Sequence, residues 1–327
     1  MTDGTPKPTA AAQVTDEPMA AEEAAAIAAD VIDNVERVIV GHRDVAEHIL
    51  SAIFARGHLL LEDVPGVGKT MLARSVARSV DCSFKRIQFT PDLLPSDVTG
   101  VNIFNQQTRA FEFQPGPVFA NIVLGDEINR APPKTQSALL EAMEEEQVTV
   151  DGETHPVPQP FAVFATQNAI ERDRTYELPV AQLDRFMKHL ALGYPTPEEE
   201  SQMLERIVGF HPIERLEAVT TAEDLRRARV TVAGVTIEAP IRDYATALAN
   251  HTRQHAALGV SPRGTIQLLR AAQARAVLSG RDYVIPDDLQ TEAVPVLAHR
   301  VRRHADDPVG AGGDEVVEAA LAETPVE

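Results

Sequence analysis

A glycine-rich turn between an apolar segment and a helical pattern is the feature that most constrains this 327-residue chain. Leu59–Leu61 is apolar, Gly66–Gly68 forms the turn, and Lys69 and Thr70 open a segment with helical spacing. Backbone N–H groups of such a loop, together with the amino terminus of the following helix, bind phosphate oxygens. Lys69 is then expected to reach the β- and γ-phosphates, and the Thr70 hydroxyl to bind Mg²⁺.

The turn departs from the usual phosphate-loop pattern at one position, since Asp63 stands where the first glycine is expected. Aspartate tolerates left-handed backbone geometry better than most residues, so we still expect the turn to form. The same pattern also suits a strand–turn–helix corner that binds no ligand. The residues assigned to the phosphate cradle are Pro65, Gly66, Val67, Gly68, Lys69, Thr70 and Met71.

The chain is acidic, with a formal net charge of −19, and its acids are concentrated near both ends. This argues against a broad nucleic-acid-binding face, although a local basic stripe is compatible with it. The single cysteine, Cys82, rules out an intrachain disulfide and fits a reducing compartment. The sequence shows no signal-peptide pattern and no apolar run of the ~20 residues that a membrane span needs. A cytoplasmic location without membrane insertion is therefore expected.

Apolar, strand-like segments alternate with helical patterns in the first two thirds of the chain. This alternation predicts an α/β fold with a mostly parallel sheet covered by helices on both faces. Two hairpins are expected to project from that core, one over residues 101–113 and one over 147–157, the second around Asp151-Gly152. The predicted core strands are Leu59–Leu61, Phe84–Phe89, Ala120–Leu124, Phe161–Thr166 and His189–Leu192.

A stiff proline-containing linker, residues 194–197, separates this core from an almost entirely helical region. We therefore expect a small all-α lid domain after the core. The expected divisions are a disordered amino-terminal tail 1–21, an α/β core 22–195, a helical lid 196–305 and an acidic tail 306–327. Val316, Val317 and Leu321 also suit a short partner-binding helical turn, but a solvated tail is the simpler interpretation.

Two acids follow the third apolar segment, at Asp126 and Glu127. Ligands of open α/β sheets bind at the carboxyl ends of the strands. Asp126 is therefore predicted to hold Mg²⁺ together with Thr70, and Glu127 to activate the attacking water as a general base. An isolated Asp-Glu pair more often belongs to a solvated turn, and the phosphate loop upstream is what favours the catalytic role.

Three further residues are candidates for catalysis. Asn168 ends another apolar segment, where its amide suits a contact with the γ-phosphate or ordinary turn chemistry. Arg185 suits an arginine finger supplied to a neighbouring subunit, or a structural partner for Asp184. Arg263 follows the capping residue Ser261 at a helix start, and both a contact with nucleotide phosphates and a plain surface charge remain open.

Taken in chain order, these elements resemble the Walker A, Walker B, sensor 1, arginine-finger and sensor 2 motifs of AAA+ ATPases. Residues 89–97, 125–143 and 181–186 more closely resemble the MoxR family of AAA+ ATPases, and the resemblance covers roughly residues 25–305. It implies ATP and Mg²⁺ as cofactors, an AAA+ P-loop core with two hairpin insertions, and a helical lid. By similarity, the segment Val38-Ile39-Val40-Gly41-His42 packs against the adenine, with Val40 and Gly41 assigned to the site; a plain break between two helices is the alternative.

The MoxR resemblance also implies assembly into a homo-oligomer, typically a ring hexamer. It implies chaperone-like remodelling or maturation of a client protein, with a von Willebrand A-domain protein as partner. The client and the ring size are not given by the sequence. Ala169 and Val180 depart from the family pattern near the expected subunit interface, which affects activation between subunits more than nucleotide binding.

Three other functions share this core: a magnesium-chelatase-like motor subunit, a nucleic-acid motor and a weakly hydrolysing nucleotide-dependent scaffold. The sequence separates the chelatase motor poorly from a remodelling ATPase. The acidic hairpin tip at residues 151–153 argues against a DNA-tracking hairpin, which needs basic residues. The intact Glu127 argues against the scaffold.

Overall fold

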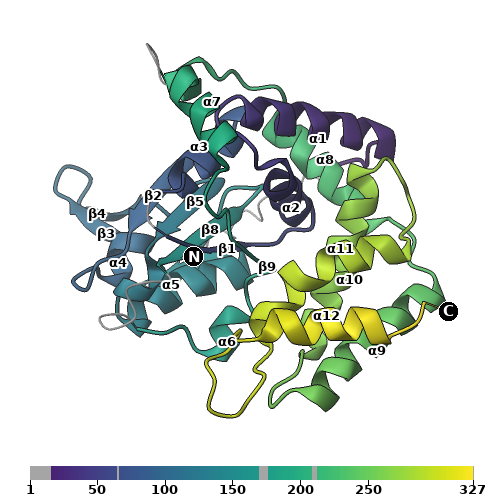
Figure 1. Cartoon of the computed structure of the whole chain (residues 1–327). Helices are drawn as coiled ribbons and strands as arrows, with labels where there is room; N and C mark the ends of the chain where they lie inside the picture. Colours follow the sequence, from purple (N-terminus) through teal and green to yellow (C-terminus); the bar gives the residue numbers. More distant parts are fainter. Residues whose placement is uncertain (1–15, 65, 169–175, 208–211, 327) are drawn as a thin grey trace, which may run out of the picture.

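A five-stranded parallel sheet forms the centre of the molecule (Figure 1). The computed structural model describes residues 16–64, 66–168, 176–207 and 212–326. The predicted parallel sheet is confirmed, and each predicted core strand overlaps an observed one. Across the sheet, the strands lie in the order β2 (Phe84–Gln88), β5 (Ile122–Asp126), β8 (Ala162–Asn168), β1 (Leu59–Asp63) and β9 (Lys188–Leu190).

Helices cover both faces of this sheet, as the sequence predicted. In β1, Leu59 and Leu61 are buried in one apolar cluster while Leu60 is buried in the other, because successive side chains of a strand point to opposite faces. The sequence of a strand that is buried on both faces is a continuous run of apolar residues. The first cluster includes side chains of α1 (Ala21–Glu36), α2 (Arg43–Phe54) and α3 (Lys69–Ser79), and the second includes side chains of α5 (Pro133–Glu145).

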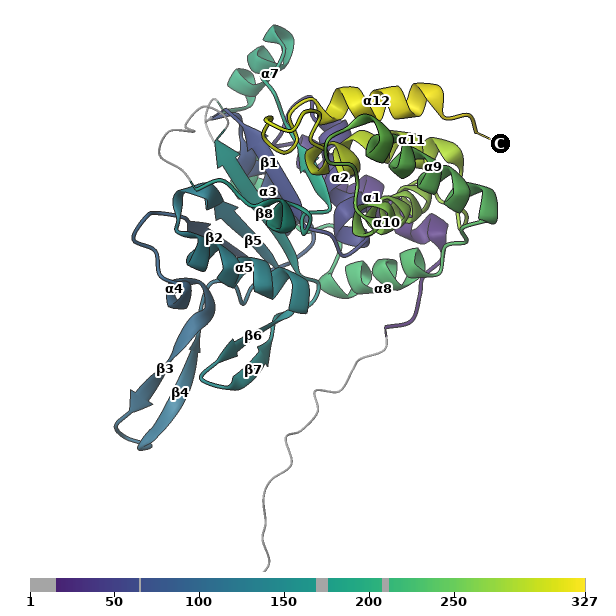
Figure 2. The same cartoon turned by 90° about the horizontal axis from the view of Figure 1, so that it is seen from below.

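Both predicted hairpins are present and project from the core on the same side (Figure 2). In the second hairpin, Asp151 and Gly152 have φ angles of 51° and 87°, the left-handed geometry that makes Asp-Gly a strong hairpin signal. Asn102 donates a hydrogen bond of 2.9 Å to Asp151 and so links the two hairpins. The strands are β3 (Gly100–Asn105) with β4 (Ala110–Pro115), after the short helix α4 (Pro95–Thr99), and β6 (Gln147–Val150) with β7 (Glu153–Pro156).

The region beyond residue 195 is helical, and α10 lies at its centre, in contact with α1, α2, α8, α9 and α11 (Figures 1 and 2). Ser261 caps α10 by accepting a hydrogen bond of 3.1 Å from the Gly264 N–H. In the described ranges, no helix has both the length and the apolar character needed to cross a bilayer. The helices are α7 (Pro197–Ile207), η3 (Pro212–Arg215), α8 (Ala222–Ala233), α9 (Ala239–His255), α10 (Pro262–Leu278), α11 (Pro286–Leu297) and η4 (Ala298–Arg300).

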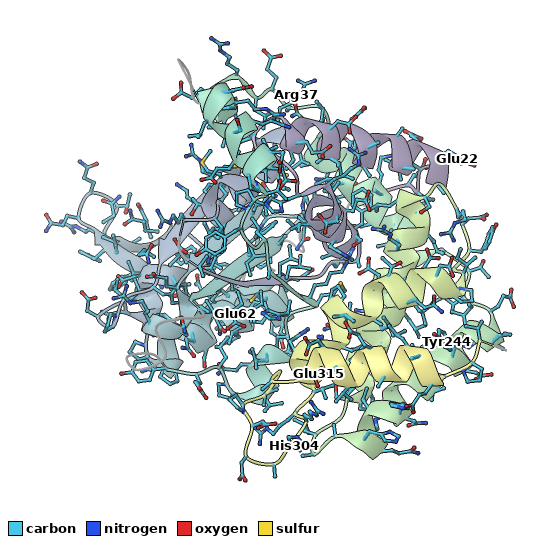
Figure 3. All side chains as sticks on the ribbon, viewed as in Figure 1. Glu22, Arg37, Glu62, Tyr244, His304 and Glu315 are labelled. Atoms are coloured by element: carbon cyan, nitrogen blue, oxygen red, sulfur yellow. The ribbon has the colours of Figure 1, made fainter. Side chains whose placement is uncertain are left out.

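The acidic carboxy-terminal segment is not the solvated tail that the sequence predicted. It contains α12 (Gly313–Glu323), which packs against α9 and α11. Glu315 on this helix, labelled in Figure 3, forms an ion pair with Arg303. The side chains that α12 buries are Val316, Val317 and Ala320. These apolar side chains pack on the chain's own lid, so the prediction of a separate tail 306–327 was wrong, and the lid extends into it.

The predicted amino-terminal tail 1–21 is described only from residue 16 onward. Within that part, Met19 is buried, and its N–H donates a hydrogen bond of 3.0 Å to the Thr231 hydroxyl on α8. The described end of the segment therefore packs on the lid rather than extending into solvent.

Candidate nucleotide-binding site

The glycine-rich turn lies between the carboxyl end of β1 and the start of α3. Gly66 and Gly68 have φ angles of 91° and 101°, which side chains other than glycine rarely adopt. Gly68 is the amino-terminal cap of α3, and the N–H groups of a helix's first turn, which have no acceptor within the helix, point toward the loop. The geometry is that of an anion cradle. Pro65 lies outside the described residues.

Asp63 does not take the left-handed geometry that the sequence comparison with phosphate loops suggested. Asp63 is the last residue of β1, and its backbone pairs in register with that of Asn168 at the end of β8. The sharp change of direction is instead made by the two glycines. A residue with ordinary strand geometry suffices at position 63.

A cavity of about 320 Å³ opens above this loop at the carboxyl edge of the sheet. It brings the predicted phosphate-binding residues together with the two acids, Asp126 and Glu127. The lining residues are Gly66, Gly68, Lys69, Thr70, Met71, Arg86, Asp126, Glu127, Thr166 and Gln167. Val67 does not line this cavity but lines the adjoining apolar cavity.

Asp126 and Glu127 are held by the neighbouring strand β8. The Thr166 hydroxyl donates a 2.6 Å hydrogen bond to Asp126 Oδ1 and accepts one of 2.9 Å from the Glu127 N–H. Glu127 has a φ of 56°, which turns the chain sharply after β5 and directs it into the short helix η1 (Ile128–Arg130). Thr166 therefore fixes the position of both acids at the mouth of the cavity.

Arg86 and Gln88 belong to this site, and the sequence analysis missed them. They alternate along β2, and the parallel register places Gln88 beside Asp126. Gln88 donates a hydrogen bond of 2.8 Å to Glu127 Oε2, which also accepts one of 2.9 Å from Arg130. The available signal was a pair of polar residues two apart in β2, which therefore point to the same face of the sheet.

Asn168 is placed as predicted at the backbone level. It is the last residue of β8, next to the end of β1 and thus at the same edge as the phosphate loop. Its side chain lies outside what the structure describes, and its role toward the γ-phosphate stays a prediction. The neighbouring Gln167 lines the cavity.

A second, more apolar cavity of about 390 Å³ adjoins the phosphate cavity and shares Gly66, Gly68 and Met71 with it. Val40, predicted to contact the adenine, lines this cavity. Gly41 does not, and its part is conformational: its φ is 82°, and a Cβ there would lie 1.9 Å from the Glu199 carboxylate. Val38, Ile39 and His42 of the same predicted segment also line this cavity. Tyr194 and Met203, which the sequence analysis missed, line it as well.

Arg185 and Arg263 lie away from both cavities. Arg185 precedes β9, which begins at Lys188, so it lies at the amino edge of the parallel sheet, opposite the phosphate loop. Both arginines pair with Glu144 near the end of α5, at 2.9 Å from Arg185 and 3.0 Å from Arg263. Neither lines the phosphate cavity of its own chain, so the possible contact of Arg263 with that cavity is not observed.

These two arginines share a basic surface pocket of about 590 Å³. Its charged lining residues are Arg56, Glu144, Glu146, Arg185, Arg229, Arg263 and Arg270. The pocket therefore carries five guanidinium groups against two carboxylates. Such an excess of positive charge suits a polyanion.

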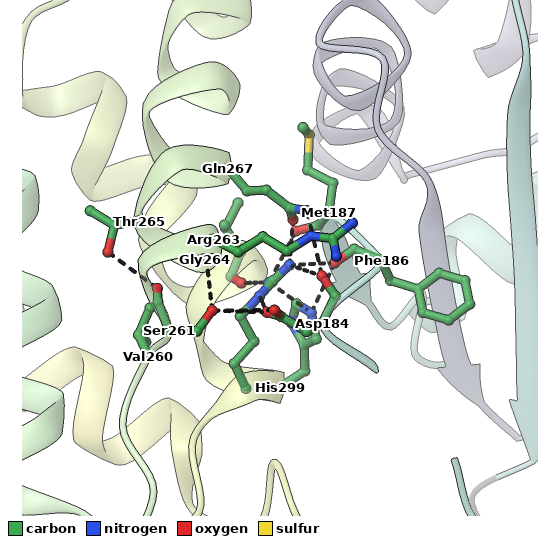
Figure 4. A network of polar contacts seen from close by, with 12 residues as sticks. Asp184, Phe186, Met187, Val260, Ser261, Arg263, Gly264, Thr265, Gln267 and His299 are labelled. Atoms are coloured by element: carbon green, nitrogen blue, oxygen red, sulfur yellow. Dashed lines mark hydrogen bonds and ion pairs between the residues drawn. The ribbon is translucent and has the colours of Figure 1, made fainter. Parts of the chain in front are cut away.

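The lid fixes the segment that carries Arg185 (Figure 4). Arg300, which is buried, donates hydrogen bonds of 2.8 Å to Asp184 Oδ1 and 2.6 Å to the Phe186 carbonyl. Ser261 also donates to the Asp184 carboxylate, at 3.2 Å. Burial lowers the pKa of Arg300 to about 10, although the Asp184 carboxylate opposes this shift. Asp184 thus pairs with a lid arginine rather than with Arg185, its predicted structural partner.

Comparisons with known proteins agree with this geometry. Residues 58–188 match the family described as "ATPase family associated with various cellular activities (AAA)", and residues 248–320 match the AAA lid domain. The chain is 55% identical over 277 residues to the uncharacterized protein YeaC of Bacillus subtilis, covering 84% of this chain and 87% of that protein. It is 43% identical over 282 residues to the chaperone MoxR1 of Mycobacterium tuberculosis, covering 83% and 74%. The chain belongs to the MoxR family of AAA+ ATPases.

A solved structure supports the same assignment. The crystal structure of a Cytophaga hutchinsonii protein, assigned as an ATPase, superimposes with a TM-score of 0.86 at 37% identity. The match covers 94% of this chain and 97% of the crystallised one. The predicted MoxR-family membership and the AAA+ fold with a helical lid are confirmed.

The residues of this MoxR-family site fit a nucleotide with Mg²⁺. Thr70 and Asp126 line one cavity and offer the hard oxygen ligands that Mg²⁺ prefers, and a nucleotide-bound Mg²⁺ needs only one or two of them from the protein. The positive-φ loop and the N–H groups at the amino terminus of α3 suit the phosphates. The adjoining apolar cavity suits a flat base.

Proposed function

We propose that this chain is an ATP hydrolase whose active site is shared between neighbouring subunits of a homo-oligomeric ring, hexameric by family resemblance. One observation carries the proposal. Lys69, Asp126 and Glu127 lie at the carboxyl edge of the sheet, whereas Arg185 and Arg263 lie at the opposite edge. A single chain therefore presents a nucleotide cavity on one side and the basic groups that suit its phosphates on another.

In the proposed reaction, the loop N–H groups and Lys69 bind the phosphates, and Thr70 and Asp126 hold Mg²⁺. Bound Mg²⁺ neutralises charge that develops on the phosphate oxygens. Glu127 accepts a proton from the water that attacks the γ-phosphorus in line, and Asn168 orients that water. Arg185 and Arg263 of the next subunit stabilise the transferring phosphoryl group, where an arginine in trans contributes about 10³- to 10⁵-fold to the rate.

We further propose that hydrolysis drives remodelling or maturation of a client protein in the cytoplasm, with a von Willebrand A-domain protein as partner. The name of the relative chaperone MoxR1 supports this role over that of a chelatase motor. The acidic tip of the second hairpin, Asp151 to Glu153, disfavours a nucleic-acid motor. Glu127 in the phosphate cavity disfavours a scaffold that rarely hydrolyses nucleotide.

Replacement of the proposed base tests the catalytic assignment. Glu127→Gln keeps the shape of the side chain but removes its basicity, so we expect it to bind ATP while turnover falls at least about 100-fold. The measurements are phosphate release and binding of a fluorescent ATP analogue. Glu141→Gln, an exposed position on α5, makes the same chemical change away from the cavity and should retain turnover. Full turnover by Glu127→Gln would contradict the assignment.

A further inference from the structure

Arg86 reaches from the edge strand β2 into the phosphate cavity and binds the carboxylate that the proposed function assigns to Mg²⁺. Its Nε donates a hydrogen bond of 3.0 Å to Asp126 Oδ2, and its Nη2 forms an ion pair with the same oxygen. Nη2 also donates a hydrogen bond of 2.8 Å to Gln88 Oε1. A guanidinium that contacts one carboxylate through two nitrogens forms a strong charge-assisted interaction.

The other oxygen of Asp126 is engaged as well. Thr166 donates its hydroxyl proton to Oδ1 at 2.6 Å. Both oxygens of the proposed magnesium-binding carboxylate therefore have a donor, and one of these donors is a cation. A carboxylate with a full positive charge beside it attracts a second cation less strongly, because the two cations compete for one negative charge.

The position of Arg86 also allows its guanidinium to move away from Asp126. β2 is an outermost strand of the sheet, and the Arg86 side chain is 48% exposed, whereas that of Asp126 is 13% exposed. The ion pair of a half-exposed arginine costs less to break than a buried one, since water replaces part of the lost hydrogen bonding. The same cavity contains Lys69 and the loop glycines, so a displaced guanidinium would stay beside the residues proposed to bind the phosphates.

From this geometry we infer that Arg86 is a built-in competitor of Mg²⁺ for Asp126. The inference rests on the proposed function, since it takes the cavity to bind a nucleotide with Mg²⁺. Arg86 neutralises Asp126 when the metal is not bound and yields the carboxylate when it is. It thereby sets how strongly nucleotide binding depends on Mg²⁺, a positioning role that is distinct from the role of Lys69.

The test compares the affinity for a fluorescent ADP analogue with Mg²⁺ and with a chelator present, using the full-length protein. Arg86→Gln removes the competing cation, so the ratio of the two affinities should rise about three- to tenfold. Arg86→Lys keeps a cation but loses the two-nitrogen contact and should raise the ratio less. Lys85→Gln is the matched control, because Lys85 is exposed on the same strand and does not line the cavity; its ratio should equal that of the wild type.

Two results would overturn the inference. An unchanged ratio in Arg86→Gln, with both affinities equal to those of the wild type, would show that the guanidinium does not compete with the metal. Equal weakening with and without Mg²⁺ would make Arg86 a phosphate ligand only. Failure of the wild type to bind the analogue under either condition is a different result, since it would overturn the proposed function itself.

Discussion

At the scale of single residues, a histidine shows how burial fixes a protonation state. His58, just before β1, donates from Nε2 to the Met143 carbonyl and accepts the Val163 N–H at Nδ1, both at 3.0 Å. Burial, with a smaller contribution from the Arg229 charge, lowers the pKa of His58 from 6.5 to about 4. The ten histidines show no metal-ligand spacing in the sequence, and in this case the ring is a neutral structural bridge.

This pKa shift predicts a loss of stability in acid. Between pH 6.5 and about 4 the unfolded chain binds a proton at His58 that the folded chain does not. The contribution of neutral His58 is therefore complete above pH 6.5 and is lost as pH falls through 4, by roughly 3 kcal/mol in all. Urea unfolding across this range measures the slope.

His58→Gln should reduce that slope by up to one proton, whereas replacing the exposed His304 by Gln should leave it unchanged. A slope that His58→Gln does not alter would contradict the assignment of the neutral ring.

Site residues that follow directly from a local sequence pattern could be predicted. Those that enter the site through the pairing register of two strands could not. Lys69, Thr70, Asp126 and Glu127 lie together as predicted, because a strand followed by a sharp turn determines where its next residues point. Arg86 entered the site only through the pairing of β2 with β5. Such a pairing joins residues 40 positions apart, and no local pattern specifies it.

At the scale of elements, a buried ion pair joins the core to the lid. Lys188 of β9 and Glu292 of α11 are both fully buried, and their charged atoms lie 2.5 Å apart. His48 and Ser51 of α2 also contact the Glu292 carboxylate. Burial alone would raise the pKa of Glu292, but the Lys188 and His48 charges outweigh it and lower the pKa to about 2. Burial lowers the pKa of Lys188.

Breaking this pair from one side should be costly. Lys188→Met leaves a buried carboxylate without its cation, and Glu292→Leu leaves a buried ammonium, so each should lower the free energy of unfolding by about 3–5 kcal/mol. The double variant removes both charges and should lose clearly less than the sum of the two single changes. Urea unfolding of the four proteins gives the coupling energy. Additive effects would contradict the structural pairing of β9 with α11.

The helices and strands were predicted accurately where apolar residues recur at a regular spacing. The prediction failed for α12, where acidic residues dominate the composition. The strands and hairpins follow from apolar runs and turn residues. In α12, acids alternate with a narrow apolar stripe, Val316, Val317 and Ala320, and composition suggested a solvated tail. The stripe is buried because α9 and α11 provide an apolar surface for it, and that surface is a property of the tertiary structure.

At the scale of the whole molecule, a site shared between subunits requires two surfaces of one chain to lie apart. The nucleotide cavity opens at one edge of the sheet, and the Arg185–Arg263 pocket lies at the other. The lid links them, because Arg300 holds Asp184, the neighbour of Arg185 in the sequence, while α1 and α2 pack on α10. A change in lid position would therefore move Arg185, which suits a motor whose subunits signal to one another.

The most direct test of the shared site is complementation between two inactive variants. Arg185→Ala and Glu127→Gln subunits, carrying different tags, are co-expressed and purified through both tags, and phosphate release is measured. Each variant alone should be inactive. If sites form between subunits, the mixture should regain about a quarter of wild-type turnover, because an intact Glu127 and an intact Arg185 then meet by chance at a quarter of the interfaces. A mixture as inactive as either variant alone would contradict the account.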